Sequence, residues 1–289
     1  MQCESRIETL QERAPFPASP WAGERISCRS VPGSLRFVLR DLMLFDAVGL
    51  SQIGAVASAN RIDTKFVLPL NQVSETLEFL RNSYTILEVG RVRLHSYRTL
   101  YFDTQAFDLY FLHHRRSRRS FKVRSRHYVD SGRSFLEVKR KSRPNRSVKL
   151  RTETPRLVTA LNGRASEFVR AHAPLDPARL ESGLWTAFRR ISLVSKSSPE
   201  RVTLDLGLQF RQAGSHADLP GVAVAELKQE RLDRASELYR CMRSLGLRPT
   251  GFSKYCVGVS LLNPGVKHNR IKPKLRMVRM LAAGGRRAG

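Results

Sequence analysis

The sequence predicts a mainly β protein, an antiparallel sheet or barrel with a few flanking helices, on three observations. Eight short segments alternate apolar and polar residues at the period of a strand, whereas few segments have a helical pattern. No βαβ rhythm runs through the chain, which disfavours a parallel sheet. Hydrophobic residues make up 41% of 289 residues, enough for a real core, so wholesale disorder is excluded.

The expected elements follow one another between residues 61 and 245. The expected strands are Arg61–Leu68, Ser96–Asp103, Ser120–Tyr128, Ser134–Lys141, Ser147–Thr152, Thr186–Val194, Arg201–Phe210 and Val222–Gln229. The expected helices are Val73–Leu80, Arg156–Ala171 and Arg231–Leu245, the last of which is followed by Gly246 as a stop signal.

The two ends of the chain differ from this middle part. Residues 1–58 have no sustained period and are punctuated by proline and glycine, so we expect a poorly ordered N-terminal extension. Residues 59–263 form the expected domain. Residues 264–289 are expected to be a basic C-terminal tail, because the stretch from Lys267 onward holds eight basic residues and no acidic one.

The charge balance points to a polyanionic partner. The chain has 51 Lys and Arg against 25 Asp and Glu, a formal net charge of +26, and the eight tail charges leave most of that excess in the body. No run approaches the ~18 apolar residues of a membrane-spanning helix. The first residues lack the layout of a secretory signal, so we expect a cytoplasmic protein.

Charged residues gather on one face of six of the expected strands. Lys122, Arg124 and Arg126 alternate along one strand, while Phe121 and Val123 point the other way. One such strand would indicate a solvated sheet face. Six such strands, four of which add a single carboxylate to the cations, instead favour a surface that binds a specific ligand. The other sets are Arg61, Asp63 and Lys65; Glu137, Lys139 and Lys141; Lys149 and Arg151; Arg201 and Asp205; and Glu226 and Lys228.

A sheet that closes with these faces inward would form a tunnel lined by Lys and Arg. Packing like charges together is costly unless a polyanion fills the space. A chain of phosphates meets this need, and Arg binds two of its oxygens at once. The few carboxylates then suit Mg²⁺ or Mn²⁺, which prefer oxygen donors and bridge phosphates.

The ordered motifs of the chain resemble the vacuolar transporter chaperone (VTC) domain. The matching pieces are Arg61-x-Asp63-x-Lys65, Leu100 to Thr104, Lys122 to Tyr128, Phe135 to Lys141, Ser147 to Arg151, Phe188 to Arg190, Arg201 to Asp205, Ala225 to Lys228 and Ser253 to Tyr255. This family belongs to the CYTH-like triphosphate tunnel metalloenzymes. The resemblance implies a closed, eight-stranded antiparallel β-barrel, and characterised members of the family polymerise polyphosphate from ATP.

The resemblance also implies roles by position. The phosphate-gripping, catalytic set would be Lys65, Lys122, Arg124, Arg126, Lys139, Lys149, Arg190, Arg201 and Lys254. Further substrate contacts would come from Arg61, Arg151, Lys228 and Ser253. Glu226 would hold Mn²⁺ or Mg²⁺, with Glu137 as a second ligand. Three positions depart from the family pattern: Asp63 replaces Glu, and Phe66 and Phe188 each replace Tyr.

The implied activity is transfer of the γ-phosphoryl group of ATP to a growing polyphosphate chain. Two alternatives stay open: a triphosphate hydrolase of the same superfamily, acting on tripolyphosphate or an RNA 5′ end, and a basic module that only binds polyphosphate or nucleic acid. The basic run 113–119 and the basic tail are either solvated segments or further polyanion contacts.

Overall fold

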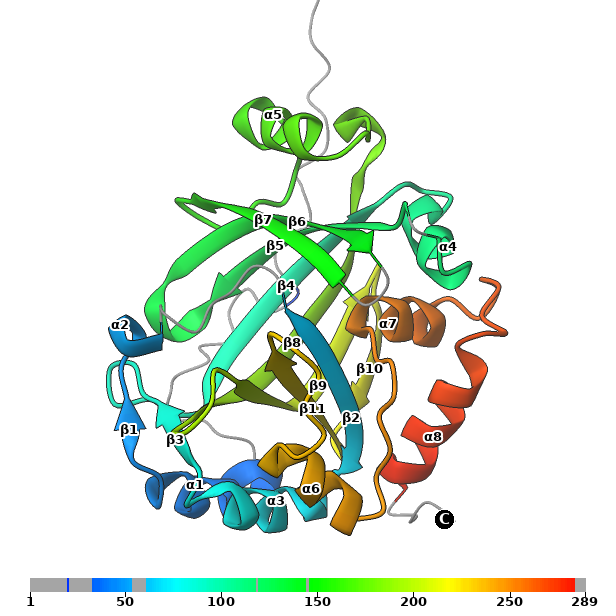
Figure 1. Ribbon diagram of the computed structural model, residues 1–289. Helices are drawn as coiled ribbons and strands as arrows, with labels where there is room; N and C mark the ends of the chain where they lie inside the picture. Colours follow the sequence, from blue (N-terminus) through cyan, green and yellow to red (C-terminus); the bar gives the residue numbers. More distant parts are fainter. Residues whose placement is uncertain (1–19, 21–32, 54–60, 118, 144–145, 284–289) are drawn as a thin grey trace, which may run out of the picture.

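The computed structural model describes residues 20, 33–53, 61–117, 119–143 and 146–283. One large sheet dominates it (Figure 1), and eight of its strands form a continuous antiparallel path. In spatial order these are β2 (Ile62–Pro69), β11 (Val222–Gln229), β9 (Arg201–Gln212), β8 (Glu181–Ser195), β4 (His95–Asp103), β5 (Phe121–Tyr128), β6 (Arg133–Arg143) and β7 (Arg146–Thr154). All eight strands predicted from the sequence are therefore confirmed.

Three short strands lie beside this path. β10 (Ser215–Leu219) forms a hairpin with β9, and β3 (Tyr84–Leu87) pairs with β8. β1 (Ala47–Val48) adds to β3 in parallel. The alternating pattern of the sequence did not reveal these strands because they have only two to five residues.

The sheet curls strongly but does not close, so the expected closed barrel is not confirmed. The path ends at β2 and β7, and within the described ranges these two strands do not pair. Instead, the segment that leads from α6 to α7 runs beside β2 (Figure 1). There the Thr250 N–H donates to the Lys65 carbonyl oxygen at 2.7 Å, so this segment bonds to the β2 backbone that a closing strand would need.

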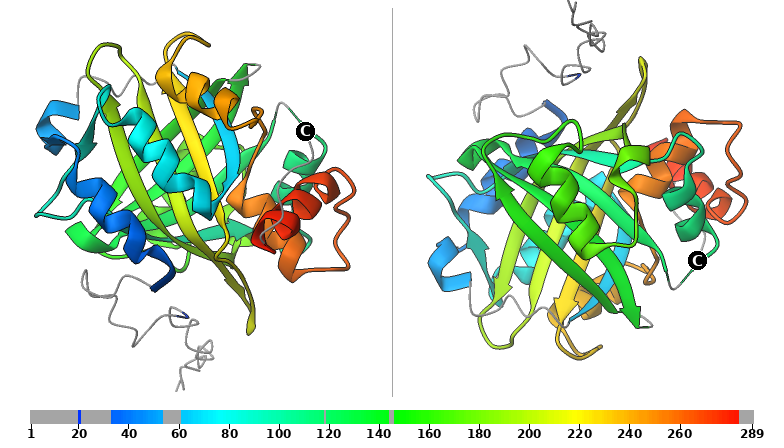
Figure 2. Two further views of the ribbon diagram at one scale, coloured as in Figure 1. Left: turned by 90° about the horizontal axis from the view of Figure 1, so that it is seen from below. Right: turned by 90° about the horizontal axis from the view of Figure 1, so that it is seen from above.

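Helices cover the convex side of the sheet (Figure 2). α1 (Arg36–Met43), α3 (Val73–Leu80) and α6 (Glu237–Ser244) pack over the β2–β11–β9–β8 half, on a core that includes Phe66, Leu204 and Ala225. α5 (Gly163–His172) covers the β5–β6 half, where Val169 joins a second apolar cluster. These strand residues are the ones that alternate with the charged positions, which therefore face the concave side.

One end of the concave side is filled by helices, and we call it the apolar end. There α7 (Lys254–Leu262) and α8 (Lys272–Ala282) pack with Val67, Leu184, Val224 and Phe210. A Cβ on Gly258 of α7 would lie 2.6 Å from both Leu184 and Phe210, so only glycine allows this close approach. α4 (Asp108–His114) lies next to α7.

Both ends of the chain contain ordered elements that the sequence interpretation did not expect. Residues 33–53, assigned to a poorly ordered extension, form α1, β1 and α2 (Leu50–Ile53), and Leu35, Val38 and Leu42 are fully buried against the sheet. The rest of that extension lies outside the described residues, apart from Pro20. The expected basic tail contains α8, whose Leu275, Val278 and Leu281 are buried, whereas its Lys272, Arg276 and Arg279 are exposed.

The predicted helices vary in accuracy. The helix Val73–Leu80 is confirmed as α3. The other two begin later than expected, at Gly163 and Glu237, because the preceding residues form turns and extended chain. Among the described helices, none has the length and apolar character needed to cross a bilayer.

Candidate functional site

The concave side beyond the apolar end carries the predicted cations, and we call it the charged end. Eleven of the twelve basic residues predicted as phosphate contacts lie on its strands or at the start of α7, and the twelfth, Arg61, directly precedes β2. Four carboxylates lie among them. The carboxylates are Asp63, Glu137, Asp205 and Glu226. Each of the four is ion-paired. The cations outnumber the carboxylates, so the face carries a positive potential that attracts anions.

Asp205 on β9 holds two of the cations in place. Arg190 on β8 donates to both of its oxygens, from Nε at 2.6 Å and from a terminal nitrogen at 2.8 Å, and Lys254 also bonds to it. Although burial opposes ionisation, Arg190 and Lys254 lower the pKa of Asp205. Ser253 caps α7 by accepting the Cys256 N–H at 3.2 Å, which places Lys254 in the first turn of the helix.

Glu137 on β6 is enclosed by cations. The Arg124 Nε donates to its Oε2 at 2.7 Å, and the Lys149 Nζ donates to its Oε1 at 3.1 Å. The carboxylate has no exposed surface. Burial opposes its ionisation, but the charges of Arg124, Arg126 and Lys149 lower its pKa. Both oxygens are therefore already bonded, and Glu137 acts here as an anchor for the arginine and the lysine.

Glu226 on β11 lies between two lysines. Its Oε1 is 3.2 Å from the Lys65 Nζ and 3.4 Å from the Lys228 Nζ. Burial again opposes ionisation, and Lys228 followed by Lys65 keeps its pKa well below the usual range. Its Oε2 accepts no hydrogen bond from any residue that the structure describes. Glu226 is thus ionised and has one oxygen available.

The carboxylates of the charged end fit the expected divalent metal to different degrees. Mg²⁺ is commonly held by one or two carboxylates with substrate phosphates and water, and the free Oε2 of Glu226 fits that donor set. Glu137 fits it less well because both its oxygens are bonded. Over the described ranges, no group of three or more His, Cys, Asp or Glu residues could hold a metal alone. A metal at Glu226 would need oxygens from its substrate.

Aromatic rings lie beneath several of the cations. Tyr97 on β4 and Phe188 on β8 stack at 5.2 Å with an interplanar angle of 5°. The Arg126 and Arg190 guanidinium carbons lie 5.1–5.9 Å from these two rings, and the Lys254 Nζ is 4.4 Å from the Phe188 ring. Phe188 thus supports cations through its ring face, a role that needs no hydroxyl.

Three buried or half-buried cations have no carboxylate partner among the described residues: Lys122, Arg126 and Arg201. Arg126 donates to the Thr99 hydroxyl at 3.3 Å. The Arg201 Nε is buried without a hydrogen-bond partner. Burial lowers the pKa of Lys122 to about 8, and burial likewise lowers the pKa of Lys228 to about 7. Such unsatisfied donors are what an incoming phosphate oxygen would satisfy.

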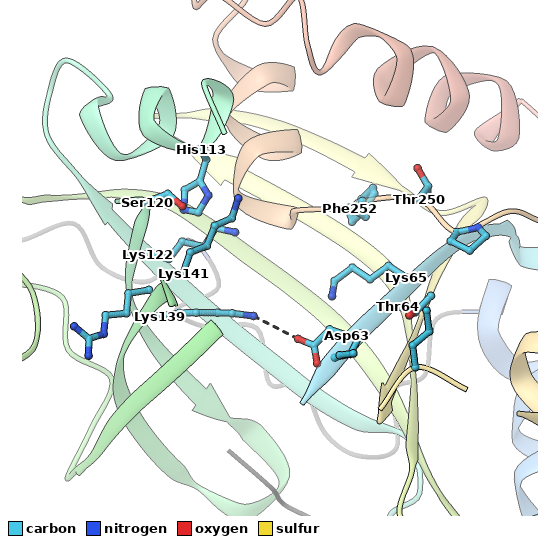
Figure 3. A pocket seen from close by; sticks show the side chains of 15 residues that line it. Asp63, Thr64, Lys65, His113, Ser120, Lys122, Lys139, Lys141, Thr250 and Phe252 are labelled. Carbon is cyan, nitrogen blue, oxygen red and sulfur yellow. Dashed lines mark ion pairs between the residues drawn. The ribbon is translucent and has the colours of Figure 1, made fainter. Parts of the chain in front are cut away.

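A cavity of about 450 Å³ opens beside these residues (Figure 3). Lys65 on β2 faces Lys122 on β5 and Lys139 on β6 across it, and Lys139 reaches Asp63 at 3.5 Å. His113, at the end of α4, also lines the cavity and bonds to the Phe121 carbonyl at 2.9 Å. Burial and the charge of Lys122 lower its pKa to about 2, so this histidine of the basic run 113–119 is neutral.

Some predicted residues lie at the edge of the charged end. Arg151 is exposed and packs over the Phe135 ring at 4.8 Å, and Arg61 pairs with Asp63 at 3.3 Å. The Ser253 hydroxyl accepts the Cys256 N–H and so caps α7. The sequence reasoning missed Asp205 as a site residue, although its alternation with Arg201 placed it on the charged face. It also missed Tyr97, for which the sequence offered no signal.

The chain matches one known family. A family model described as the VTC domain matches residues 60–263. No curated protein matches the chain.

Solved structures with a similar arrangement include a proposed adenylyl cyclase from Hippeastrum with a dominant triphosphatase activity. It is 18% identical, and the match covers 69% of this chain and 95% of that one with a TM-score of 0.44. A proposed adenylate cyclase from Bacillus halodurans is 12% identical, covering 67% and 95% with a TM-score of 0.43. A protein from Pyrococcus horikoshii is 13% identical, covering 70% and 98% with a TM-score of 0.41.

Proposed function

The chain belongs to the VTC domain family, and from this premise we propose that it is a polyphosphate polymerase. It would transfer the γ-phosphoryl group of ATP to the end of a polyphosphate chain at the charged end of the concave side. The observation that carries the proposal is the excess of cations there, together with the three that lack a carboxylate partner. These side chains would position the phosphates and neutralise charge that develops during transfer.

The state of Glu137, Asp205 and Glu226, three of the four carboxylates at the charged end, favours transfer to a phosphate acceptor over transfer to water. Glu137, Asp205 and Glu226 are ion-paired, and the surrounding cations lower the pKa of each. Carboxylates with such low pKa values are poor general bases. A terminal phosphate oxygen is already largely ionised near neutral pH, with a second pKa of about 6, and needs no base to attack. A water molecule would need one.

The residues have distinct parts in this proposal. Arg190 and Lys254, held by Asp205, would bind equatorial oxygens of the transferred group. Lys122 and Arg126 would bind the neighbouring phosphates. Glu226 would hold Mg²⁺ or Mn²⁺ through its free oxygen, and the metal would supply further positive charge against the substrate phosphates.

A product analysis tests the proposal. The protein is incubated with ATP and Mn²⁺, with and without a short polyphosphate primer, and the products are resolved by length. We expect ADP and a ladder of lengthening chains. If orthophosphate is the sole new phosphate product, the protein is a triphosphate hydrolase instead. The absence of turnover, combined with tight and salt-sensitive polyphosphate binding, would assign a binding module.

A further inference from the structure

Asp103, the last residue of β4, is a buried carboxylate that makes no ion pair within the described ranges. Its exposed fraction is 5%, and it accepts four hydrogen bonds. Three come from the backbone N–H groups of Thr104 and Leu109, each at 2.8 Å, and of Tyr110, at 2.9 Å. The fourth comes from the Tyr255 hydroxyl. One carboxylate therefore joins β4, α4 and α7.

The backbone bonds of Asp103 hold the first turn of α4. Phe107, the residue before this helix, has a φ of 60°, and its side chain forms no cap. Asp103 accepts instead from Leu109 and Tyr110, whose N–H groups have no partner inside the helix. The bond from Tyr255 is not part of this cap, so it serves to connect α7 to a group that is already fixed.

Tyr255 is the second residue of α7 and directly follows Lys254. Its side chain is buried, and its ring packs against Tyr101 at 5.1 Å and against the edge of Tyr110 at 6.5 Å. Successive residues of an α-helix point about 100° apart around the axis. A hydrogen bond that fixes the direction of Tyr255 therefore also fixes the direction of Lys254.

Lys254 needs such a support on the side away from the substrate. Its ammonium bonds to Asp205 and lies 4.4 Å from the Phe188 ring. When it binds a phosphate oxygen, it must share its donors between that oxygen and Asp205. The orientation of Lys254 during transfer therefore cannot depend on Asp205 alone.

The other polar contact between α4 and α7 lies too far along the helix to do this. The Tyr110 hydroxyl and the Ser260 Oγ share a hydrogen bond of 3.0 Å. Ser260 comes six residues after Lys254, which is about 9 Å along the axis. This bond holds the body of α7, whereas the bond from Tyr255 holds its first turn.

We propose that Asp103 and Tyr255 are positioning residues for Lys254, and that their hydrogen bond fixes the rotation of α7 so that the Lys254 ammonium reaches the phosphoryl group being transferred. This inference rests on the proposed function for the role of Lys254 and adds the residues that orient it. Neither residue contacts the substrate. Their effect passes through the position of Lys254, to which phosphoryl transfer is sensitive because small misplacements slow the reaction strongly.

The first test measures the position of Lys254 without using activity. Tyr255→Phe removes the hydroxyl and keeps the ring, and Tyr110→Phe is the matched control because it removes a hydroxyl bond between the same two helices. The full chain is acetylated with acetic anhydride, and mass spectrometry compares Lys254 with the exposed Lys272 as internal reference. We expect Lys254 to react about fivefold faster in Tyr255→Phe, because its first turn opens more often, and within about 1.5-fold of wild type in Tyr110→Phe. Equal rates in the two variants would overturn the proposal.

The second test asks whether this position matters for transfer. Tyr255→Phe should lower kcat for chain elongation about tenfold and leave the KM for ATP within about twofold, since Lys254 is assigned to the transferred group. In a Lys254→Ala background the same change should lower kcat less than about twofold, because the residue that it positions is absent. A tenfold loss in both backgrounds, or equal kcat values for Tyr255→Phe and Tyr110→Phe, would overturn the proposal.

The two readouts separate this inference from the proposed function. Faster acetylation of Lys254 in Tyr255→Phe alone, in a protein that forms no product ladder, would refute the polymerase and support the positioning of Lys254. A ladder from the wild type, with equal acetylation of Lys254 in all three chains, would refute the positioning alone.

Discussion

The two ends of the concave side are built from the same strands on the same face, yet one is charged and the other apolar. Along β2, Lys65 of the charged end is followed two residues later by Val67 of the apolar end. Along β11, Glu226 lies at the charged end and Val224, two residues earlier, lies at the apolar end. At the apolar end, α7 and α8 fill the space, whereas at the charged end no element of the described chain does. The change in residue type therefore marks the limit between a face that helices cover and a face that the described chain leaves open.

The largest expected effect comes from emptying the apolar end. Phe210→Ala removes a ring with 0% exposure, which should lower the free energy of unfolding by about 3–5 kcal/mol. Urea denaturation measures this loss. The matched control Phe79→Ala truncates a ring that is 41% exposed and should cost less than about 1 kcal/mol. ATP affinity of folded Phe210→Ala should stay within about threefold of wild type, and a larger loss would show that the two ends are not independent.

The second-largest expected effect is the loss of activity when Glu226 of the charged end is replaced. Glu226→Gln removes the negative charge between Lys65 and Lys228 and the free carboxylate oxygen. We expect kcat/KM for chain elongation to fall at least about 100-fold, or about 3 kcal/mol of transition-state stabilisation. The far-UV circular dichroism spectrum should not change. Glu153→Gln, in an exposed pair with Arg133, is the control and should retain full activity. Wild-type turnover by Glu226→Gln would contradict the role of this carboxylate.

The smallest effect is the pH dependence of binding. Burial lowers the pKa of Lys228 to about 7 and that of Lys122 to about 8, so both lose their charge as the pH rises through these values. Phosphate binding favours the protonated amines and should weaken as the pH rises. We expect ATP affinity to fall about tenfold between about pH 7.5 and about pH 9.5, where the phosphates stay fully ionised. Titration calorimetry at both pH values measures this change.

Lys228→Arg provides the comparison for the pH experiment. Arginine stays charged throughout this range, so the decrease in affinity should become shallower. An identical slope in wild type and Lys228→Arg would remove Lys228 from the explanation.

The sequence predicted the strands better than the helices, for a physical reason. The strands alternate with a period of two, and the alternation of Lys122, Arg124 and Arg126 with apolar residues is visible in any short window. α7 has apolar residues on all sides because it is almost fully buried, so it shows no helical period. α8 was hidden by its many cations, although Leu275, Val278 and Leu281 follow helical spacing.

The sequence predicted which charged residues form the candidate site, but it could not predict which of them form ion pairs with one another. Strand alternation places Asp205 and Glu226 on one face, and the family resemblance adds Arg190. Neither can show that Asp205 holds Arg190 together with Lys254, which comes from a helix 49 residues further along the chain. The open edge of the sheet was also beyond reach, because the closed barrel was inferred from a family resemblance. The open edge depends on the segment around Thr250, which bonds to the β2 backbone in place of a closing strand.

The two unpaired edges of the sheet are protected from self-association by different means. An unpaired strand exposes backbone donors and acceptors that can template a neighbouring copy. Beside β2, the chain around Thr250 already bonds to that backbone. β7 has no such partner among the described residues, but its exposed Lys149 and Arg151 place like charges where a second β7 would have to approach. The same cations that make the face suitable for phosphate also discourage edge-to-edge aggregation.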